Sequence, residues 1–145
     1  MTIVLAAVCF FNSISTAQSL YVNEVLATNS SCCYDEHGDH DDFIEIYIPA
    51  GSSFSLNGYH LTDYMNDPTK WSFPDLTVTD TTWIIVRAVD DEEQGEIHTS
   101  FQLNGTSGEG VYIFDSDLNL VDSVTFGPQE ENISLGRSTD GGDTW

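Results

Sequence analysis

Phe-Ile-Glu-Ile-Tyr-Ile, residues 43–48, is the clearest structural signal in this chain. Successive side chains of a β-strand point to opposite faces, so an extended segment here has two different surfaces. Ile44, Ile46 and Ile48 share one face, and the residues between them share the other. A strand with two such faces fits a sheet that packs against a second sheet.

Other segments of the same kind flank this strand on both sides. Apolar and β-branched residues lie between turn signals at residues 20–26, 54–61, 71–73, 83–89, 110–115 and 120–126, and the turn dipeptide Asn57-Gly58 interrupts the second of them. About seven short strands at spacings near ten residues are typical of a β-sandwich or barrel. We therefore predict that residues 20–137 form an antiparallel sandwich. Its expected packing residues include Ile44, Ile46, Trp83, Ile85, Tyr112 and Phe114.

The charge of the chain is strongly negative. It carries 24 acidic residues against three basic ones, for a formal net charge of -21 at pH 7. Nucleic acids and anionic lipid surfaces would be repelled, which argues against both as partners. Cationic partners and divalent metal ions would be attracted. The same charge also suits a protein that stays soluble at high ionic strength.

The amino terminus has the pattern of a signal peptide. An apolar run over residues 3–11 is followed by Ser15-Thr16-Ala17, which places small residues where a signal peptidase reads them. The run is too short to span a bilayer. Cleavage after Ala17 would make residues 1–17 a signal and the mature protein secreted or exposed at the cell surface. A buried amino-terminal strand is the alternative.

Several further segments resemble, in order, the lamin tail domain family in its bacterial, exported form. They are the opening strand at residues 21–29, the acidic loop and strand at 35–47, and the segments 55–63, 68–74, 98–103, 121–126 and 134–137. The resemblance implies an immunoglobulin-like β-sandwich over residues 18–137, with 138–145 as the start of a linker or a truncated tail. It supplies no catalytic residue, and it implies other domains in the same polypeptide.

The acidic loop is the strongest candidate site in the sequence. Residues 35–42 read Asp-Glu-His-Gly-Asp-His-Asp-Asp. Crowded carboxylates repel one another unless they are solvated or neutralised, and Ca²⁺ neutralises them through oxygen ligands. Asp35, Asp39 and Asp41 are the expected Ca²⁺ ligands. A solvated loop without metal, or a transition metal held by His37 and His40, are the alternatives.

The sequence favours binding over catalysis. Apart from the acidic loop, it contains no recognised metal or phosphate motif and no nucleophile elbow. The first hypothesis is a non-catalytic extracellular interaction module with a protein or glycan partner. The alternatives are a Ca²⁺-stabilised adhesion or glycan-binding module and an accessory domain of a secreted hydrolase. The redox state of the neighbouring Cys32 and Cys33 is left open, because a bridge between them would be strained.

Overall fold

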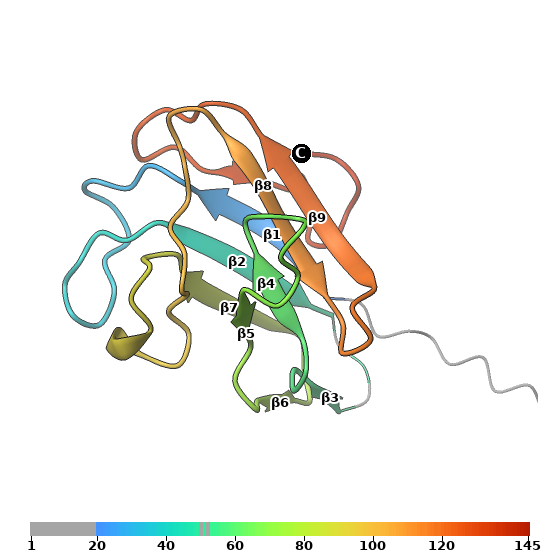
Figure 1. Cartoon of the computed structure of the whole chain (residues 1–145). Helices are drawn as coiled ribbons and strands as arrows, with labels where there is room; N and C mark the ends of the chain where they lie inside the picture. The colour runs from blue at the N-terminus through green and yellow to red at the C-terminus, as the bar shows by residue number, and fades with distance from the viewer. Residues whose placement is uncertain (1–19, 50, 52) are drawn as a thin grey trace, which may run out of the picture.

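The computed structural model describes residues 20–49, 51 and 53–145, and it confirms an all-β chain (Figure 1). A single short 3₁₀ helix, Glu92–Gln94, accompanies the strands in the described residues. The strands are β1 (Tyr21–Leu26), β2 (Phe43–Ile48), β3 (Phe54–Ser55), β4 (His60–Thr62), β5 (Trp71–Ser72), β6 (Thr77–Val78), β7 (Thr82–Arg87), β8 (Glu109–Phe114), β9 (Leu120–Phe126) and β10 (Leu135–Gly136).

Two four-stranded antiparallel sheets form the sandwich. One has the strand order β10-β1-β2-β7, and the other has the order β5-β4-β8-β9. A small ladder between β3 and β6 closes one end. The sheets face each other with β1 in contact with β8 and β9, and the aliphatic side chains of both sheets fill the space between them (Figure 1).

β2 lies between β1 and β7 in its sheet, and its two-faced sequence fits the packing of this sheet on the other. All six of its residues pair with β7, and the opposite edge pairs with β1. Ile44, Ile46 and Ile48 are completely buried against the second sheet. The alternation read from residues 43–48 therefore sets the inner face of the sandwich.

The predicted packing role of Trp83 is wrong. In the ladder between β2 and β7, Ile46 is opposite Ile84 and Tyr47 is opposite Trp83. Residues directly opposite each other point to the same face. Ile84 and Val86 therefore face the core, while Trp83 is 47% exposed and lies against Tyr47 in a tilted arrangement, with 5.5 Å between ring centroids.

The remaining packing predictions have mixed outcomes. Phe114 is buried with Ile44 and Ile46, as expected, whereas Ile85 and Tyr112 are only half-buried. Trp71 and Phe73 are buried and make an edge-to-face contact at 5.0 Å. Trp71 therefore belongs to the core.

The Asn57-Gly58 turn connects strands that belong to different ladders. Gly58 has a positive φ of 83°, which glycine adopts without the strain of a Cβ. The Tyr59 N–H closes the turn by donating to the Leu56 carbonyl at 3.0 Å. However, β3 pairs with β6, whereas β4 pairs with β5 and β8. The turn thus passes the chain from the small ladder to the large sheet.

A largely buried ion pair between Asp122 and Arg137 joins the two sheets. Arg137 Nη2 donates to both Asp122 carboxylate oxygens, at 3.0 and 2.8 Å, and these side chains are 6% and 17% exposed. The Val22 N–H donates to Asp122 and the Val22 carbonyl accepts from Arg137 Nε, each at 2.8 Å. β1 has a register shift at this point, so the ion pair supplies the hydrogen bonds of Val22 at the interrupted ladder.

Residues 138–145, where the sequence predicts the start of a linker or a truncated tail, lie back against β1. The Gly141 N–H donates to Asn23 Oδ1 at 3.1 Å, and Asn23 Nδ2 donates to Asp140 at 2.9 Å. The Ser138 N–H also donates to the Thr144 carbonyl at 2.7 Å. These bonds hold the segment on the outer side of the sheet.

The predicted signal peptide, residues 1–17, lies outside the described residues, as do the first two residues of the predicted domain. Over residues 20–49, 51 and 53–145, no helical segment has the length and apolar character that a bilayer crossing requires.

Candidate functional site

Two long loops meet at one end of the sandwich. The first connects β1 to β2 and contains the acidic loop, and the second connects β7 to β8 over residues 88–108. His98 forms a parallel bridge with Arg87, and the Thr99 N–H donates to the Arg87 carbonyl at 2.8 Å. The Ala88 N–H donates to the Asp42 carbonyl at 2.9 Å. These bonds bring His98 beside the acidic loop.

Asp35 organises the acidic loop from within. Its Oδ1 accepts hydrogen bonds from the backbone N–H groups of His37 and Asp39, each at 2.8 Å. Gly38, with a positive φ of 91°, lets the chain turn tightly between them. Burial opposes ionisation, but the donors at Asp39 and His37 outweigh it and hold the pKa of Asp35 at about 2. Asp35 is thus a carboxylate at neutral pH.

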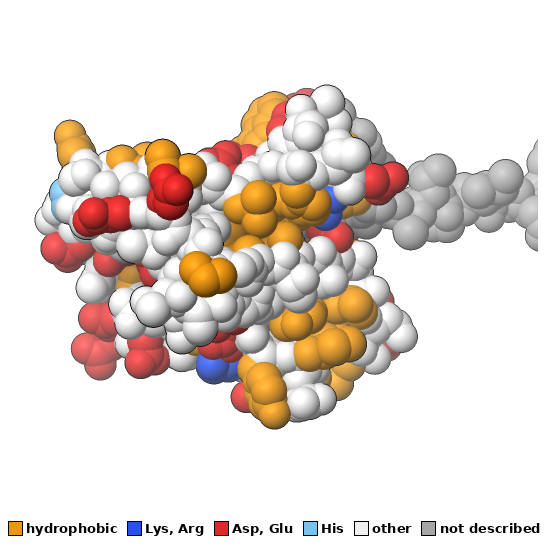
Figure 2. Space-filling model, turned by 90° about the horizontal axis from the view of Figure 1, so that it is seen from above, with side chains coloured by type: hydrophobic (Ala, Val, Ile, Leu, Met, Phe, Trp, Pro, Cys, Tyr) orange, Lys and Arg blue, Asp and Glu red, His pale blue; other side chains and the backbone are white. Residues whose placement is uncertain are grey.

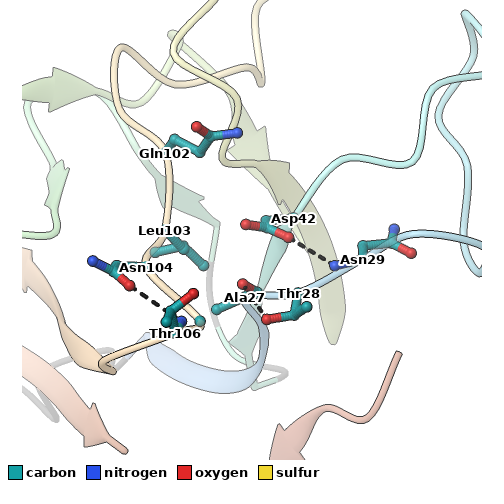
Figure 3. Close-up of a pocket in the computed structure, with 9 residues that line it drawn as sticks. Ala27, Thr28, Asn29, Asp42, Gln102, Leu103, Asn104 and Thr106 are labelled. Atoms are coloured by element: carbon teal, nitrogen blue, oxygen red, sulfur yellow. Dashed lines mark hydrogen bonds between the residues drawn. The ribbon is translucent and has the colours of Figure 1, made fainter. Parts of the chain in front are cut away.

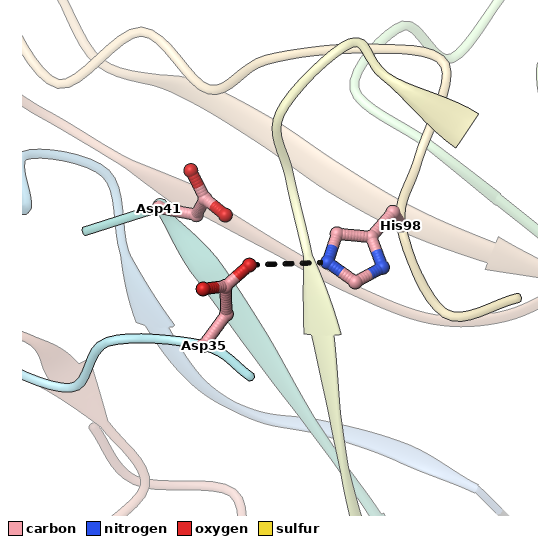
Figure 4. Close-up of side chains that lie close together, drawn as sticks. All are labelled: Asp35, Asp41 and His98. Carbon is pink, nitrogen blue, oxygen red and sulfur yellow. Dashed lines mark ion pairs between the residues drawn. The ribbon is translucent and has the colours of Figure 1, made fainter. Parts of the chain in front are cut away.

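His98 lies next to Asp35 and is fully enclosed. Its side chain and that of Asp35 have no exposed surface, and its Nε2 lies 3.6 Å from Asp35 Oδ2 (Figure 4). That distance is too long for a hydrogen bond. In the described part of the chain, neither ring nitrogen of His98 has a hydrogen-bond partner, and neither does Asp35 Oδ2.

Asp41 completes the group. One potential ligand atom from each of Asp35, Asp41 and His98 lies within 4.8 Å of the others. Asp41 Oδ2 is buried and has no hydrogen-bond partner among the described residues. Burial raises the pKa of Asp41, and the negative charges of Asp35 and Asp39 raise it further. We call these three side chains the Asp–Asp–His cluster.

The structure places the candidate ligands read from the sequence in different settings. Asp35 and Asp41 come together, whereas Asp39 is exposed and is not a member of the cluster. His37 Nε2 is 3.0 Å from the Gln94 carbonyl, and His40 Nδ1 is 3.1 Å from the Cys32 carbonyl, so both exposed histidines contact backbone. Cys32 and its neighbour are free cysteines.

His98 was not predicted as a site residue. It lies in the other loop, far from residues 35–42 in the sequence, and no spacing rule connects the two. The only sequence signal is a lone histidine in a segment that also carries Ile97, Phe101 and Leu103. A lone histidine of this kind is more often a structural core residue than a ligand, and only tertiary structure brings it to the carboxylates.

A polar hollow of about 530 Å³ is lined in part by Asp42, the sequence neighbour of Asp41 (Figure 3). Residues 27–29, Asp42 and residues 102–106 line it. Asp42 Oδ1 accepts from the Asn29 N–H at 3.0 Å, which orients the carboxylate at the wall. Burial raises the pKa of Asp42 to about 6, the Asn29 N–H acts in the opposite direction, and Asp41 adds to the increase.

Gly105 allows the two walls of the hollow to meet. A Cβ at this position would overlap Thr28 Oγ1 and the Ala27 carbonyl oxygen. The Gly105 carbonyl also accepts from the Gln129 N–H at 2.9 Å. Residues 104–106 therefore lie directly on the end of β1, and only glycine permits that approach.

This end of the molecule is acidic. Figure 2 shows Asp and Glu side chains gathered on the left of the view, where the two loops lie in Figure 1. The cluster offers two carboxylates and an imidazole, a donor set that suits a cation, and the hollow offers hydroxyl, amide and carboxylate groups. No family model matches the chain, and comparisons with curated proteins and with solved structures also found no match.

Proposed function

We propose that this chain is a non-catalytic interaction module that binds an uncharged or positively charged partner through the loop end of its sandwich. The observation that carries this proposal is the polar hollow between residues 27–29, Asp42 and residues 102–106. Its volume of about 530 Å³ falls within the range of ordinary ligand pockets, roughly 300–1,000 Å³.

The chemistry of the hollow supports a hydrogen-bonded partner. Gln102 and Thr106 are exposed, and their side chains make no hydrogen bond to other described residues. Both side chains remain available to a ligand. Asp42 adds an acceptor at the wall. A glycan or a peptide segment presents the hydroxyl and amide groups that such side chains bind.

The negative charge of the chain supports a partner that is neutral or positively charged. A formal net charge of -21 repels anionic ligands over several ångströms and attracts cationic ones. The resemblance to lamin tail domains and the signal-like amino terminus support a location outside the cell. We propose an immunoglobulin-like module, outside the cell or at its surface, within a larger polypeptide.

Nuclear magnetic resonance titration tests this proposal. The probes are a neutral oligosaccharide mixture, a lysine-rich peptide and an anionic polysaccharide. We expect the backbone amides of residues 27–29 and 102–106 to shift with a neutral or cationic probe and not with the anionic one. Shifts confined to other surfaces, or shifts only with the anionic probe, would contradict the proposal.

A pair of substitutions sharpens the titration. Replacing Gln102 and Thr106 with Ala removes two side-chain hydrogen bonds of about 1 kcal/mol each, which weakens binding roughly thirtyfold. Thr125→Ala, on the exposed face of β9, is the matched control and leaves affinity unchanged. Equal affinity in the double variant would place the binding surface elsewhere.

A further inference from the structure

We infer that Asp35, Asp41 and His98 form a binding site for a divalent transition-metal ion, for which Zn²⁺ is the test ion. The inference goes beyond the partner-binding role proposed above and does not depend on it. It starts from the burial of the cluster: the side chains of Asp35 and His98 have no exposed surface, and their facing atoms lie 3.6 Å apart, yet neither atom has a hydrogen-bond partner among the described residues.

Buried polar atoms without partners are rare in folded proteins, because each costs the free energy of its lost hydration. Here Asp35 Oδ2, Asp41 Oδ2 and both ring nitrogens of His98 lack a partner within the described residues. All of these side chains belong to the Asp–Asp–His cluster. A cation bound between them would satisfy one nitrogen and both carboxylate oxygens together.

The distances fit a bound ion. Two ligand atoms that each lie roughly 2.1 Å from a tetrahedral Zn²⁺ are about 3.4 Å apart. Asp35 Oδ2 and His98 Nε2 are 3.6 Å apart. The three ligand atoms lie within 4.8 Å of one another, so ion binding would require the Asp41 oxygen to move closer to the other two.

Gly95 gives the ring of His98 the room that it needs. The Nδ1 atom of His98 faces Gly95, where a Cβ would lie only 2.8 Å away. The absence of a side chain at residue 95 thus leaves room for the ring to present Nε2 to the two aspartates. Nδ1 itself has no hydrogen-bond partner among the described residues.

The donor set selects the class of metal. Imidazole suits zinc and other transition metals, whereas Ca²⁺ takes six to eight oxygen ligands. Two of the three Ca²⁺ ligands expected from the sequence, Asp35 and Asp41, belong to the cluster. The third member is His98 and not Asp39. Three protein ligands leave a fourth position for water, and a bound ion would connect the two loops across the end of the sandwich.

Calorimetric titration of the full chain, stripped of metal with a chelator, tests the site. We expect one Zn²⁺ per chain and much weaker binding of Ca²⁺. Asp35→Asn and Asp41→Asn keep the side-chain shape and, at Asp35, the Oδ1 acceptor, so both variants should fold. Each should lower Zn²⁺ affinity at least tenfold, since even losses in the outer shell of a metal site cost about 10- to 100-fold.

Two controls separate this site from the alternatives in the same loop. Asp39→Asn removes the same charge from an exposed position and should change Zn²⁺ affinity less than about twofold. The double variant His37→Gln/His40→Gln removes the exposed histidines and should also retain Zn²⁺ binding. Loss of Zn²⁺ binding in either control, or Ca²⁺ binding that depends on Asp39, would overturn the inference.

Resonances of the imidazole nitrogens provide a test that needs no substitution at the buried histidine. In the unmodified chain, Zn²⁺ should shift the Nε2 resonance of His98 and leave that of His60, which hydrogen-bonds Ser72, unchanged. Shifts confined to His37 and His40 would refute the site. Absence of any Zn²⁺ binding would also refute it and would leave His98 and Asp35 as an internal ion pair.

Discussion

Removing the carboxylate of Asp122 should destabilise the fold more than any surface charge change. Asp122→Ala leaves the guanidinium of Arg137, which is 6% exposed, without its anionic partner. It also removes the acceptor of the Val22 N–H, which lies 2.8 Å from Asp122 Oδ2. Breaking a buried ion pair from one side costs about 3–5 kcal/mol, because the remaining charge stays buried and unpaired.

A double-mutant cycle measures this cost. The single variants Asp122→Ala and Arg137→Ala and their combination are unfolded in urea, and we expect a coupling energy of about 2–3 kcal/mol. A loss of about 4 kcal/mol in the Asp122 variant corresponds to a fall in melting temperature of roughly 10–20 °C for a domain of this size. The melting temperatures are read from circular dichroism.

The pair Lys70–Asp63 is the control, because its cation is more exposed than Arg137. Its shortest N–O distance is 2.6 Å, and the side chains of Lys70 and Asp63 are 30% and 13% exposed, against 6% and 17% for Arg137 and Asp122. Asp63→Ala removes the same charge as Asp122→Ala, and the coupling energy of this pair should stay below about 1 kcal/mol and weaken in 1 M salt. If the Arg137 pair couples no more strongly than the control, or if salt weakens both equally, the ion pair does not join the sheets as described.

Three further predictions follow from single residues. In urea unfolding, Ile84→Ala should cost about 2–5 kcal/mol and Trp83→Ala about 1 kcal/mol or less, and the reverse order would contradict the register of β7. Gly105→Ala should cost about 1–3 kcal/mol in the same assay because its Cβ would overlap the end of β1, whereas Gly127→Ala, with no atom within 4 Å, should be nearly neutral; equal costs would refute the close approach. A carboxyl resonance titration should give Asp115 a pKa below the unfolded value of about 3.9, since backbone and side-chain N–H groups donate to it. Its contribution to stability is then present above the unfolded pKa and lost as pH falls through the folded pKa; an unshifted or raised value would contradict the loop geometry.

The sequence predicts the fold best where a strand shows its alternation locally. The expected strands at 43–48 and 120–126 coincide with β2 and β9. Residues 83–86 fail as a guide to orientation because each of them is apolar, so no alternation shows which residues face inward. The sequence does not predict β6 and β10, which are two residues long and lack the aromatic residues that mark the equally short β3 and β5.

The residues of the candidate site also differ in whether the local sequence reveals them. Asp35 and Asp41 stand out because acidic residues crowd a short loop, which is visible locally. Asp39 is exposed because the turn directs its N–H, and not its side chain, toward Asp35. The residue types in this loop do not predict that turn. His98 reaches the cluster through its bridge with Arg87, a tertiary contact.

On one edge, β1 bonds to residues more than 100 positions later in the sequence, and this arrangement bears on how the protein folds. Gln129 Nε2 donates to the Val25 carbonyl across 104 residues, and Arg137 Nε donates to the Val22 carbonyl across 115. Contacts between such distant residues slow folding, because the intervening chain must first lose entropy. During synthesis, β1 emerges first but cannot complete its hydrogen bonds until residue 137 has been added. Until then this edge of β1 is open to pairing with another chain.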